Sequence, residues 1–203
     1  MAIILGLDIS TTCIGWSVIQ YKNLTYNLIG IGYFEPIKNV SNVFDAHPKK
    51  LKDLDSLEFL DMIQMSKNMI TELLRKYNPD KVCIEDYIRY MAGGSGANTI
   101  IPLACLNRSI CSLVYEYFDF DKKRVSICNV MSIRSLIKKS AKLSELPKKE
   151  ELPPILEKLM GIKVPILLEE SKRNKSKISS FTYDQSDSIA CSYYITANNK
   201  ENK

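Results

Sequence analysis

The order of short apolar runs along the chain constrains the fold more than any other feature of this sequence. Three runs rich in β-branched and aromatic residues, over 3–8, 15–21 and 24–33, are separated by polar breaks. Asn23, a residue type that tolerates the left-handed backbone of a tight turn, separates the second run from the third. The first third of the chain therefore predicts a three-stranded antiparallel meander.

The remaining two thirds alternate between helical and strand patterns. Residues 35–56 predict a loop, and Ser56 is a candidate cap for a helix over 57–77. Pro102 is tolerated only in a first turn, so a helix that ends near 117 is expected to start near residue 100. The other expected elements are strands over 81–86 and 124–130 and helices over 132–140, from Pro153 or Pro154, and over 184–197. This order predicts one mixed α/β domain over residues 1–203, with a central sheet flanked by helices.

Composition is that of an ordinary globular protein. Hydrophobic residues make up 45% of the chain and charged residues 25%, which argues against wholesale disorder. No unbroken apolar run reaches the ~18 residues that a membrane helix needs. The N-terminus reaches Asp8 without a basic leader or a small-residue cleavage site. We therefore expect neither a membrane partner nor a signal peptide.

Cysteine and histidine usage restricts the possible chemistry. The six cysteines form no CxxC pair, and four lie inside apolar runs, so we expect reduced, buried thiols in an intracellular, reducing compartment. The cytoplasm of a microbe or of a virus-infected cell is the expected location, with an organelle left open. The only histidine is His47, which excludes Ser-His-Asp, Cys-His and HExxH sites. A hydrolase of this composition would depend on carboxylates and a bound metal.

The net charge of +5 is concentrated in one segment. Residues 138–177 contain eleven Lys or Arg and six Asp or Glu, an excess equal to the charge of the whole chain. A basic segment on a neutral body predicts a surface that binds a polyanion, the alternative being a solvated loop without a partner. The candidate contacts to nucleic acid are Lys138, Lys139, Lys142, Lys148, Lys149, Lys172, Arg173, Lys175 and Lys177.

Four acidic residues interrupt or border apolar runs, where a charge is costly unless it is compensated. Asp8 ends the first expected strand, in ILGLDIS, and Glu85 ends the fourth, in VCIED. Asp184 and Asp187 lie three residues apart at the start of the last expected helix, hence on one face. Two such carboxylates repel each other, and a divalent cation relieves that repulsion. Taken singly, Asp8 is also compatible with a turn and Asp187 with an ordinary N-terminal helix acid.

A set of carboxylates of this kind suits phosphodiester hydrolysis. Two Mg²⁺ ions held about 3.5–4 Å apart activate a water and stabilise the leaving 3′ oxygen. Mg²⁺ takes hard oxygen ligands, and we expect Mn²⁺ to substitute for it. The sequence therefore predicts a Mg²⁺-dependent nuclease with two ions per site, in which the catalytic and metal-binding residues are Asp8, Glu85, Asp184 and Asp187.

The motifs that carry these acids resemble those of the RuvC-type Holliday junction resolvases, which belong to the RNase H-like, retroviral-integrase-like nuclease superfamily. ILGLDISTTCIGWSVI resembles their first hairpin, IEDYIRYMAGGSGANT their second motif, VMSIRSLIKKS their basic helix and DQSDSIACS their closing DxxDA helix. The similarity spans most of the chain in the same order. Ser188 departs from the residue usual after the last Asp, and the basic loop appears here as the longer KLSELPKKEELPP.

The resemblance implies an RNase H-like fold whose five-stranded mixed sheet has three antiparallel strands followed by parallel strands. It also implies that the four acids bind the catalytic metals, that the enzyme makes symmetric nicks in four-way DNA junctions, and that it is a homodimer through the helix near 100–117. The loop after Glu85 would then wedge an apolar side chain into the junction, with Tyr87, Ile88 and Tyr90 as candidates. The alternative is that these side chains pack under the glycine-rich turn.

Other interpretations stay open at this point. GLDISTT also resembles the first phosphate motif of the actin and sugar-kinase group, but no second DxG motif or glycine-rich adenosine site follows. A related nuclease acting on flaps, on other branched DNA or on RNA–DNA hybrids has the same acids. A catalytically inactive DNA-binding protein on the same fold is the alternative outside the enzymes.

Overall fold

The structure, a computed structural model, describes residues 1–44, 49–87, 97–170 and 176–201. Its centre is a sheet in the order β3-β2-β1-β4-β5. The five strands are β1 (Ala2–Ile9), β2 (Ile14–Lys22), β3 (Thr25–Phe34), β4 (Lys81–Glu85) and β5 (Val125–Cys128). β2 is antiparallel to both β1 and β3, whereas β4 is parallel to β1 and β5 is parallel to β4. The predicted mixed sheet is confirmed.

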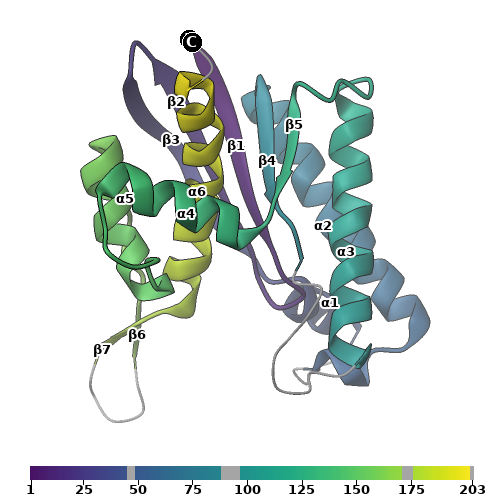
Figure 1. The fold of residues 1–203 in the computed structure, drawn as a ribbon. Helices are drawn as coiled ribbons and strands as arrows, with labels where there is room; N and C mark the ends of the chain where they lie inside the picture. The colour runs from purple at the N-terminus through teal and green to yellow at the C-terminus, as the bar shows by residue number, and fades with distance from the viewer. Residues whose placement is uncertain (45–48, 88–96, 171–175, 202–203) are drawn as a thin grey trace.

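Helices cover both faces of the sheet (Figure 1). One layer holds α1 (Pro36–Phe44), α2 (Ser56–Tyr77) and α3 (Ala97–Tyr117), and the other holds α4 (Val130–Ala141), α5 (Leu152–Met160) and α6 (Ser180–Glu201). Side chains of a strand alternate between the two layers. In β1, Leu5 and Leu7 join the core beneath α2 and α3, whereas Ile4 joins the core beneath α6.

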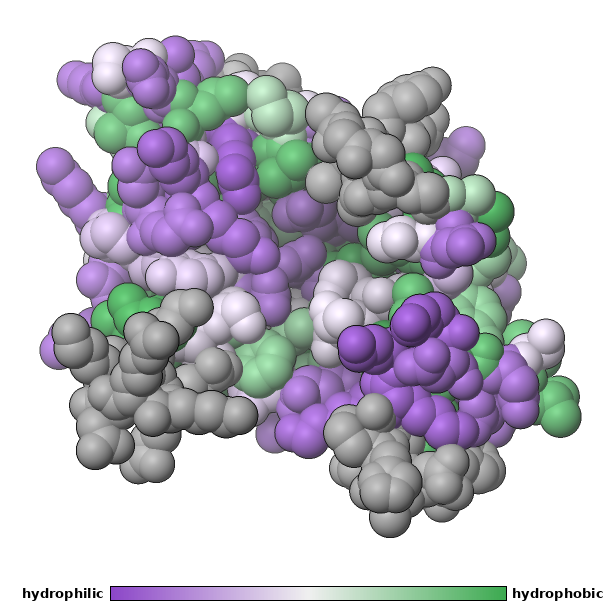
Figure 2. Space-filling model, turned by 90° about the horizontal axis from the view of Figure 1, so that it is seen from below, coloured by the Kyte–Doolittle hydropathy of each residue, from purple (hydrophilic) through white to green (hydrophobic). Residues whose placement is uncertain are grey.

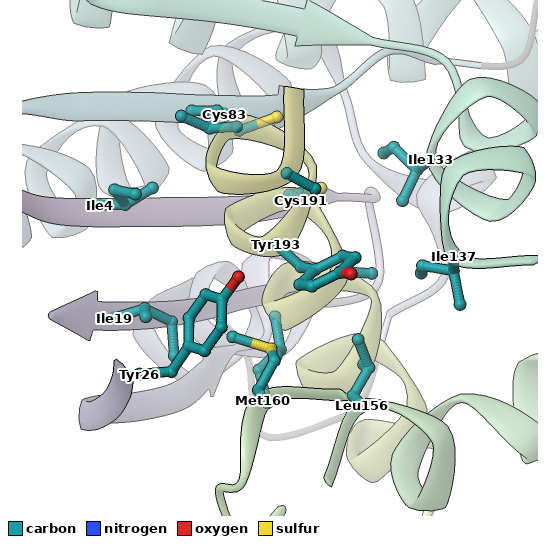
Figure 3. Packing of buried hydrophobic residues seen from close by; sticks show 14 of the residues in the cluster. Ile4, Ile19, Tyr26, Cys83, Ile133, Ile137, Leu156, Met160, Cys191 and Tyr193 are labelled. Atoms are coloured by element: carbon teal, nitrogen blue, oxygen red, sulfur yellow. The ribbon is translucent and has the colours of Figure 1, made fainter. Parts of the chain in front are cut away.

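The core beneath α6 is shown in Figure 3. The ring of Tyr26 in β3 lies 6.1 Å from that of Tyr193 in α6, and the Tyr26 hydroxyl is 3.2 Å from Thr196 Oγ1. The same cluster includes Ile133, Ile137, Leu156 and Met160. It therefore ties α4 and α5 to α6, and α6 to the sheet.

The helix starts differ from those expected. Asp55, not Ser56, caps α2, because its carboxylate accepts hydrogen bonds from the N–H groups of Leu57 (2.8 Å) and Glu58 (2.9 Å). α6 begins at Ser180, four residues before the expected start at Asp184. Asp184 consequently lies in the second turn, where the helix macrodipole favours its negative charge less than at the N-terminus.

Two further expectations need correction. Residues 35–56 are not a simple loop, because Ile37 and Val40 of α1 are buried in the core, and a short 3₁₀ helix, η1 (Leu51–Asp53), follows. Pro36 is the first residue of α1, a position where a missing N–H costs nothing.

α3 begins at Ala97, so Pro102 lies beyond its first turn. A hairpin that was not predicted joins β6 (Leu168–Glu170) to β7 (Ser176–Ile178).

α6 lies unusually close to the sheet at two glycines. A Cβ atom on Gly6 of β1 would lie 1.9 Å from the Ser188 carbonyl oxygen, and one on Gly15 of β2 would lie 2.3 Å from the Asp184 carbonyl oxygen. Only glycine permits this approach. The contact at Gly15 therefore fixes the distance between the sheet and the turn of α6 that carries Asp184.

α3 combines an apolar composition with an exposed surface. Among the described residues it is the one helix long and apolar enough to cross a membrane by length and composition, yet only 28% of its most apolar window is buried. No membrane span was expected from the sequence because Asn107 and Arg108 interrupt the apolar run of this helix. Ile101 is 59% exposed, and Cys105 is exposed as well. The outer face of α3 therefore presents apolar surface that nothing in this chain covers among the described residues.

We expect Gly6→Ala to destabilise the protein by about 1–3 kcal/mol, because α6 must move away from its Cβ. Urea unfolding of the variant and the wild type measures this difference. Ser135→Ala, on the exposed face of α4, is the matched control and should leave the free energy of unfolding within about 0.5 kcal/mol. Equal stability of Gly6→Ala and wild type would contradict the close packing of α6.

Candidate active site

All four predicted acids line one pocket at the end of the sheet where β1 and β4 stop. The pocket has a volume of about 590 Å³, and Asp8, Glu85, Asp184 and Asp187 belong to its wall. Figure 2 looks onto this end of the molecule and shows hydrophilic surface around a recessed centre. The structure thus brings together residues that are up to 179 positions apart in the sequence.

The strand pattern explains why the two strand acids meet. β1 and β4 are parallel neighbours with Leu7 opposite Ile84, so the next residues, Asp8 and Glu85, lie side by side. Gly6 lies two residues before Asp8 and faces α6, which puts Asp8 on the same face. Cys83, two residues before Glu85, likewise belongs to the core beneath α6. Both carboxylates therefore point toward the helix that carries the other two.

Burial and mutual repulsion make these carboxyl groups hard to ionise. Burial raises the pKa of Asp8 well above its usual value, and the charges of Glu85 and Asp187 raise it further. Burial and the charge of Asp187 raise the pKa of Glu85 from the ordinary 4.5 to about 8. The pKa of Asp187 is also raised, by burial, although the charges of Lys149 and Arg134 oppose this. The cluster carries more negative charge than its surroundings compensate.

Two basic residues partly neutralise the cluster. Lys149 Nζ lies 2.7 Å from Asp184 Oδ1 and 3.2 Å from Asp187 Oδ2. Burial disfavours the charged form of Lys149, but the charges of Asp187, Asp184 and Asp8 outweigh it and raise the pKa of Lys149. Arg134 of α4 lies 3.7 Å from Asp187 Oδ1. Lys149 was predicted to contact nucleic acid, and here it is the internal counter-charge of the helix acids.

Arg134 was not identified as a site residue from the sequence. It stands in VMSIRSLIKKS directly after Ile133 and three residues before Ile137, which are both buried. An arginine beside the buried stripe of an amphipathic helix is the signal that could have identified it. Its Nε atom is buried without a hydrogen-bond partner among the described residues, so it retains the capacity to donate to one more oxygen.

The side-chain oxygen atoms of this pocket are ligands that suit a hard cation, although they do not surround a common point at which one could bind. Within the ranges that the structure describes, no three Asp, Glu, Cys or His side chains are close enough together to hold a metal ion as they stand. Lys149 instead bridges the two helix acids. The four carboxylates and the hydroxyls of Ser10 and Thr12 offer oxygen ligands, and Cys13 in the same wall is a thiol whose pKa burial raises, so its thiolate form is disfavoured. Burial and, to a smaller extent, repulsion between the carboxylates raise the pKa values of Asp8 and Glu85, and a bound cation would favour their charged forms.

The other predicted residues are spread more widely. Lys139, Lys142 and Lys148 are exposed and Lys138 is half-buried, in or after α4. The backbone of Lys177 lies opposite that of Glu169 in the β6–β7 ladder, while Lys172, Arg173 and Lys175 lie outside the described residues. Tyr87 packs against Arg108, whose guanidinium is 4.9 Å from the ring centre, and Ile88 and Tyr90 lie outside the described residues. Contact of these residues with DNA stays a prediction.

The electrostatics predict opposite effects of two substitutions on the metal-free protein. The pKa of Glu85 is about 8 in the folded protein and 4.5 in the unfolded chain, so ionisation of Glu85 lowers the free energy of unfolding as the pH rises from 4.5 to 8. Above about pH 8 the full loss is present. Glu85→Gln should therefore raise the melting temperature in EDTA at pH 8.5, by roughly 2–4 °C per kcal/mol gained, and should have little effect near pH 4. Lys149→Met should lower it, because Asp184 and Asp187 lose their counter-charge. Thermal unfolding in EDTA tests both signs, and a shift in the same direction for both would contradict this account.

Comparison with known proteins supports the fold assignment. No protein-family model and no curated protein matches the chain. Among solved structures, Thermus thermophilus RuvC in complex with Holliday junction substrate is similar, with 15% identity, a TM-score of 0.61 and coverage of 100% of this chain and 97% of that one. A second Thermus thermophilus RuvC structure has 13% identity, a TM-score of 0.59 and coverage of 98% and 96%. The yeast mitochondrial Holliday junction resolvase Ydc2 has 12% identity, a TM-score of 0.61 and coverage of 98% and 80%. The chain therefore has the RNase H-like fold of the RuvC-type Holliday junction resolvases.

Proposed function

We propose that this protein is a structure-selective endodeoxyribonuclease that resolves four-way DNA junctions. The observation that carries the proposal is the gathering of Asp8, Glu85, Asp184 and Asp187 in one pocket at the end of β1 and β4. The fold is that of Thermus thermophilus RuvC, whose structure was solved with a Holliday junction substrate. The described residues of the pocket wall include four carboxylates and no histidine, a set that favours metal-dependent hydrolysis over nucleophilic catalysis.

We assign metal binding to the four acids. Mg²⁺, or Mn²⁺ in its place, would supply activation of a water and stabilisation of the leaving oxygen when two ions are bound. The chain itself buries the carboxylates, which strengthens every charge interaction in the pocket. Arg134 lies 3.7 Å from Asp187 and belongs to the pocket wall, so its guanidinium would interact with a phosphate bound there. Lys149 holds Asp184 and Asp187 through direct contacts and supplies part of the counter-charge that bound cations would add to.

We further propose that exposed lysines next to this pocket bind the phosphates of the DNA arms. Lys139, Lys142 and Lys148 are exposed on the segment that leads to Lys149 in the pocket wall. Contacts of this kind give affinity and salt dependence without reading sequence. They suit an enzyme that recognises the shape of a junction.

A homodimer formed through α3 would allow two symmetric nicks. The outer face of α3 presents apolar surface, including Ile101 at 59% exposure, although Leu106 and Ile110 of the same helix are buried in the core. A second copy packing on this face would remove it from water, and a two-fold arrangement suits a four-way substrate. Five of the six free cysteines are buried, whereas Cys105 is exposed, contrary to expectation, and a reducing compartment stays a proposal.

Asp8→Asn and Glu85→Gln should each abolish Mg²⁺-dependent cleavage of a synthetic four-way junction, with a loss of at least about a thousandfold. Each substitution removes one carboxylate from the pocket and keeps its size. Junction binding, measured by fluorescence anisotropy, should be retained. Flap, linear duplex and RNA–DNA hybrid substrates tested in parallel decide the substrate class.

Full activity in EDTA, or cleavage at the normal rate by either variant, would overturn the metal-dependent mechanism. Preferred cleavage of flaps over junctions would instead replace the substrate and keep the mechanism. Binding of junctions without cleavage by the wild type in Mg²⁺ or Mn²⁺ would favour a catalytically inactive DNA-binding protein.

Ile101→Glu should convert a dimer to a monomer, because it places a charge in the apolar face of α3. Sedimentation velocity measures the change. Ile166→Glu is the matched control, since Ile166 has the same 59% exposure but lies outside α3, and it should leave the dimer intact. A monomeric wild type, or an Ile101→Glu protein that stays dimeric, would refute this interface.

A further inference from the structure

A second, larger cavity adjoins the carboxylate pocket. It has a volume of about 770 Å³ and lies between the turn after β1, the start of α1, the η1 segment and the start of α3. Thr12 belongs to the walls of both cavities. A polymeric ligand bound in the carboxylate pocket could therefore extend past Thr12 into this second cavity.

Lysines dominate the charged residues of this cavity. Its wall contains Lys38, Lys49, Lys50 and Lys52, with Glu35 as its one acidic residue among the described part of the chain. Lys38 pairs with Glu35 at 2.9 Å, and Lys49 pairs with Glu58 outside the wall. Lys50 and Lys52 are exposed and form no ion pair within the described residues. Two positive charges are thus available to a ligand.

The acidic residues over 53–58 lie outside the cavity wall and accept hydrogen bonds from backbone N–H groups. Asp53 accepts a hydrogen bond from the Lys50 N–H (3.1 Å), and Asp55 accepts two from the first turn of α2. Glu58 accepts one from the Asp55 N–H (3.0 Å) in addition to its pair with Lys49. These carboxylates satisfy backbone donors at the start of η1 and α2, and none lines the cavity. Glu58 offsets the charge of Lys49, but within the described part of the chain none of these carboxylates forms an ion pair with Lys50 or Lys52.

The remaining wall combines aliphatic and neutral polar groups. Ile37 and Leu51 supply apolar surface, and Thr12, Asn98 and Thr99 supply hydroxyl and amide groups. A sugar–phosphate backbone has matching chemistry, because its phosphates need cations and donors while its deoxyribose carbons pack against aliphatic side chains. A nonpolar ligand would leave Lys50 and Lys52 unused, and a bare phosphate would leave the apolar wall unused.

We infer that this cavity binds the sugar–phosphate backbone of the DNA strand next to the cleaved phosphate, with Lys50 and Lys52 contacting its phosphates. The inference rests on the proposed nuclease function and adds a second basic surface. The lysines of the segment 138–177 reach the carboxylate pocket at Lys149, whereas this cavity reaches it at Thr12. The sequence did not suggest the site, because acidic residues balance the lysines over 35–58 and the local charge appears unremarkable.

The first test measures junction binding by the double variant Lys50→Ala/Lys52→Ala as a function of salt concentration. Each lost phosphate contact should lower the slope of log K against log salt by about 0.9 and weaken binding roughly eightfold at 0.1 M salt. Lys22→Ala/Lys123→Ala is the matched control, because both lysines are exposed at the opposite end of the sheet. An unchanged slope in the Lys50/Lys52 variant, with the control also unchanged, would overturn the inference.

The second test locates the contact on the DNA. Single methylphosphonates, which remove one phosphate charge each, are placed at successive positions on both sides of the cut. At the contacted position the loss of affinity should be large for the wild type and absent for the Lys50→Ala/Lys52→Ala variant. Equal losses for both proteins at every position would exclude a direct phosphate contact by these lysines.

These outcomes are separable from failure of the proposed function. If the wild-type protein neither binds nor cleaves branched DNA, the proposed function fails and this inference with it. If the wild type binds and cleaves but the Lys50→Ala/Lys52→Ala variant behaves like the control, only the inference fails.

Discussion

The close contact between α6 and the sheet is the constraint on which the rest of this structure depends. Glycines in β1 and β2 let the backbone of α6 approach the strands more closely than any side chain would permit. A core of aromatic and aliphatic residues on the same face then ties α4 and α5 to α6. Since Asp184 and Asp187 are carried by α6, and Asp8 and Glu85 by the strands beneath it, this one contact sets the geometry of the carboxylate pocket.

Placing four carboxylates together at a buried sheet end works against folding. The raised pKa values of Asp8, Glu85 and Asp187 express this cost. Lys149 and Arg134 offset part of it through direct contacts with the helix acids, and burial of the surrounding apolar core supplies the remaining stability. A pocket that remains short of positive charge is suited to attract cations, which is the property that the proposed metal-dependent chemistry requires.

The arrangement around the pocket points to a long, charged ligand. Exposed lysines follow α4 on one side, and the lysine-lined cavity beside η1 lies on the other, joined to the pocket at Thr12. The apolar outer face of α3 belongs to the helix layer opposite α4, and the start of α3 also lines the lysine-lined cavity. A second copy packed on α3 would therefore leave the lysines that follow α4 free for DNA.

Whereas the parallel strands were expected from the resemblance to the RuvC-type resolvases, the sequence by itself determined the five strands in their order along the chain, the antiparallel meander of the first three and the identity of the four acids that meet in the pocket. These follow from local rules, because alternating apolar residues define strands and an acid at a strand end lies at the sheet edge. Asp55 as the cap of α2 was also readable, from the D-x-x-E spacing, although Ser56 was predicted.

Only the tertiary structure decided the rest. The segment Pro36–Phe44 has apolar residues at helical spacing, but only the fold shows that Ile37 and Val40 have a core to enter. Lys149 serves as a counter-charge because folding brings it to Asp184, 35 residues away, whereas its neighbours in the basic segment stay exposed. The cavity at Lys50 and Lys52 arises from four separate segments, and its charge is visible only once the nearby acids are seen to bind backbone donors. Interactions between distant residues depend on the packed arrangement, and composition and spacing along the chain do not encode them directly.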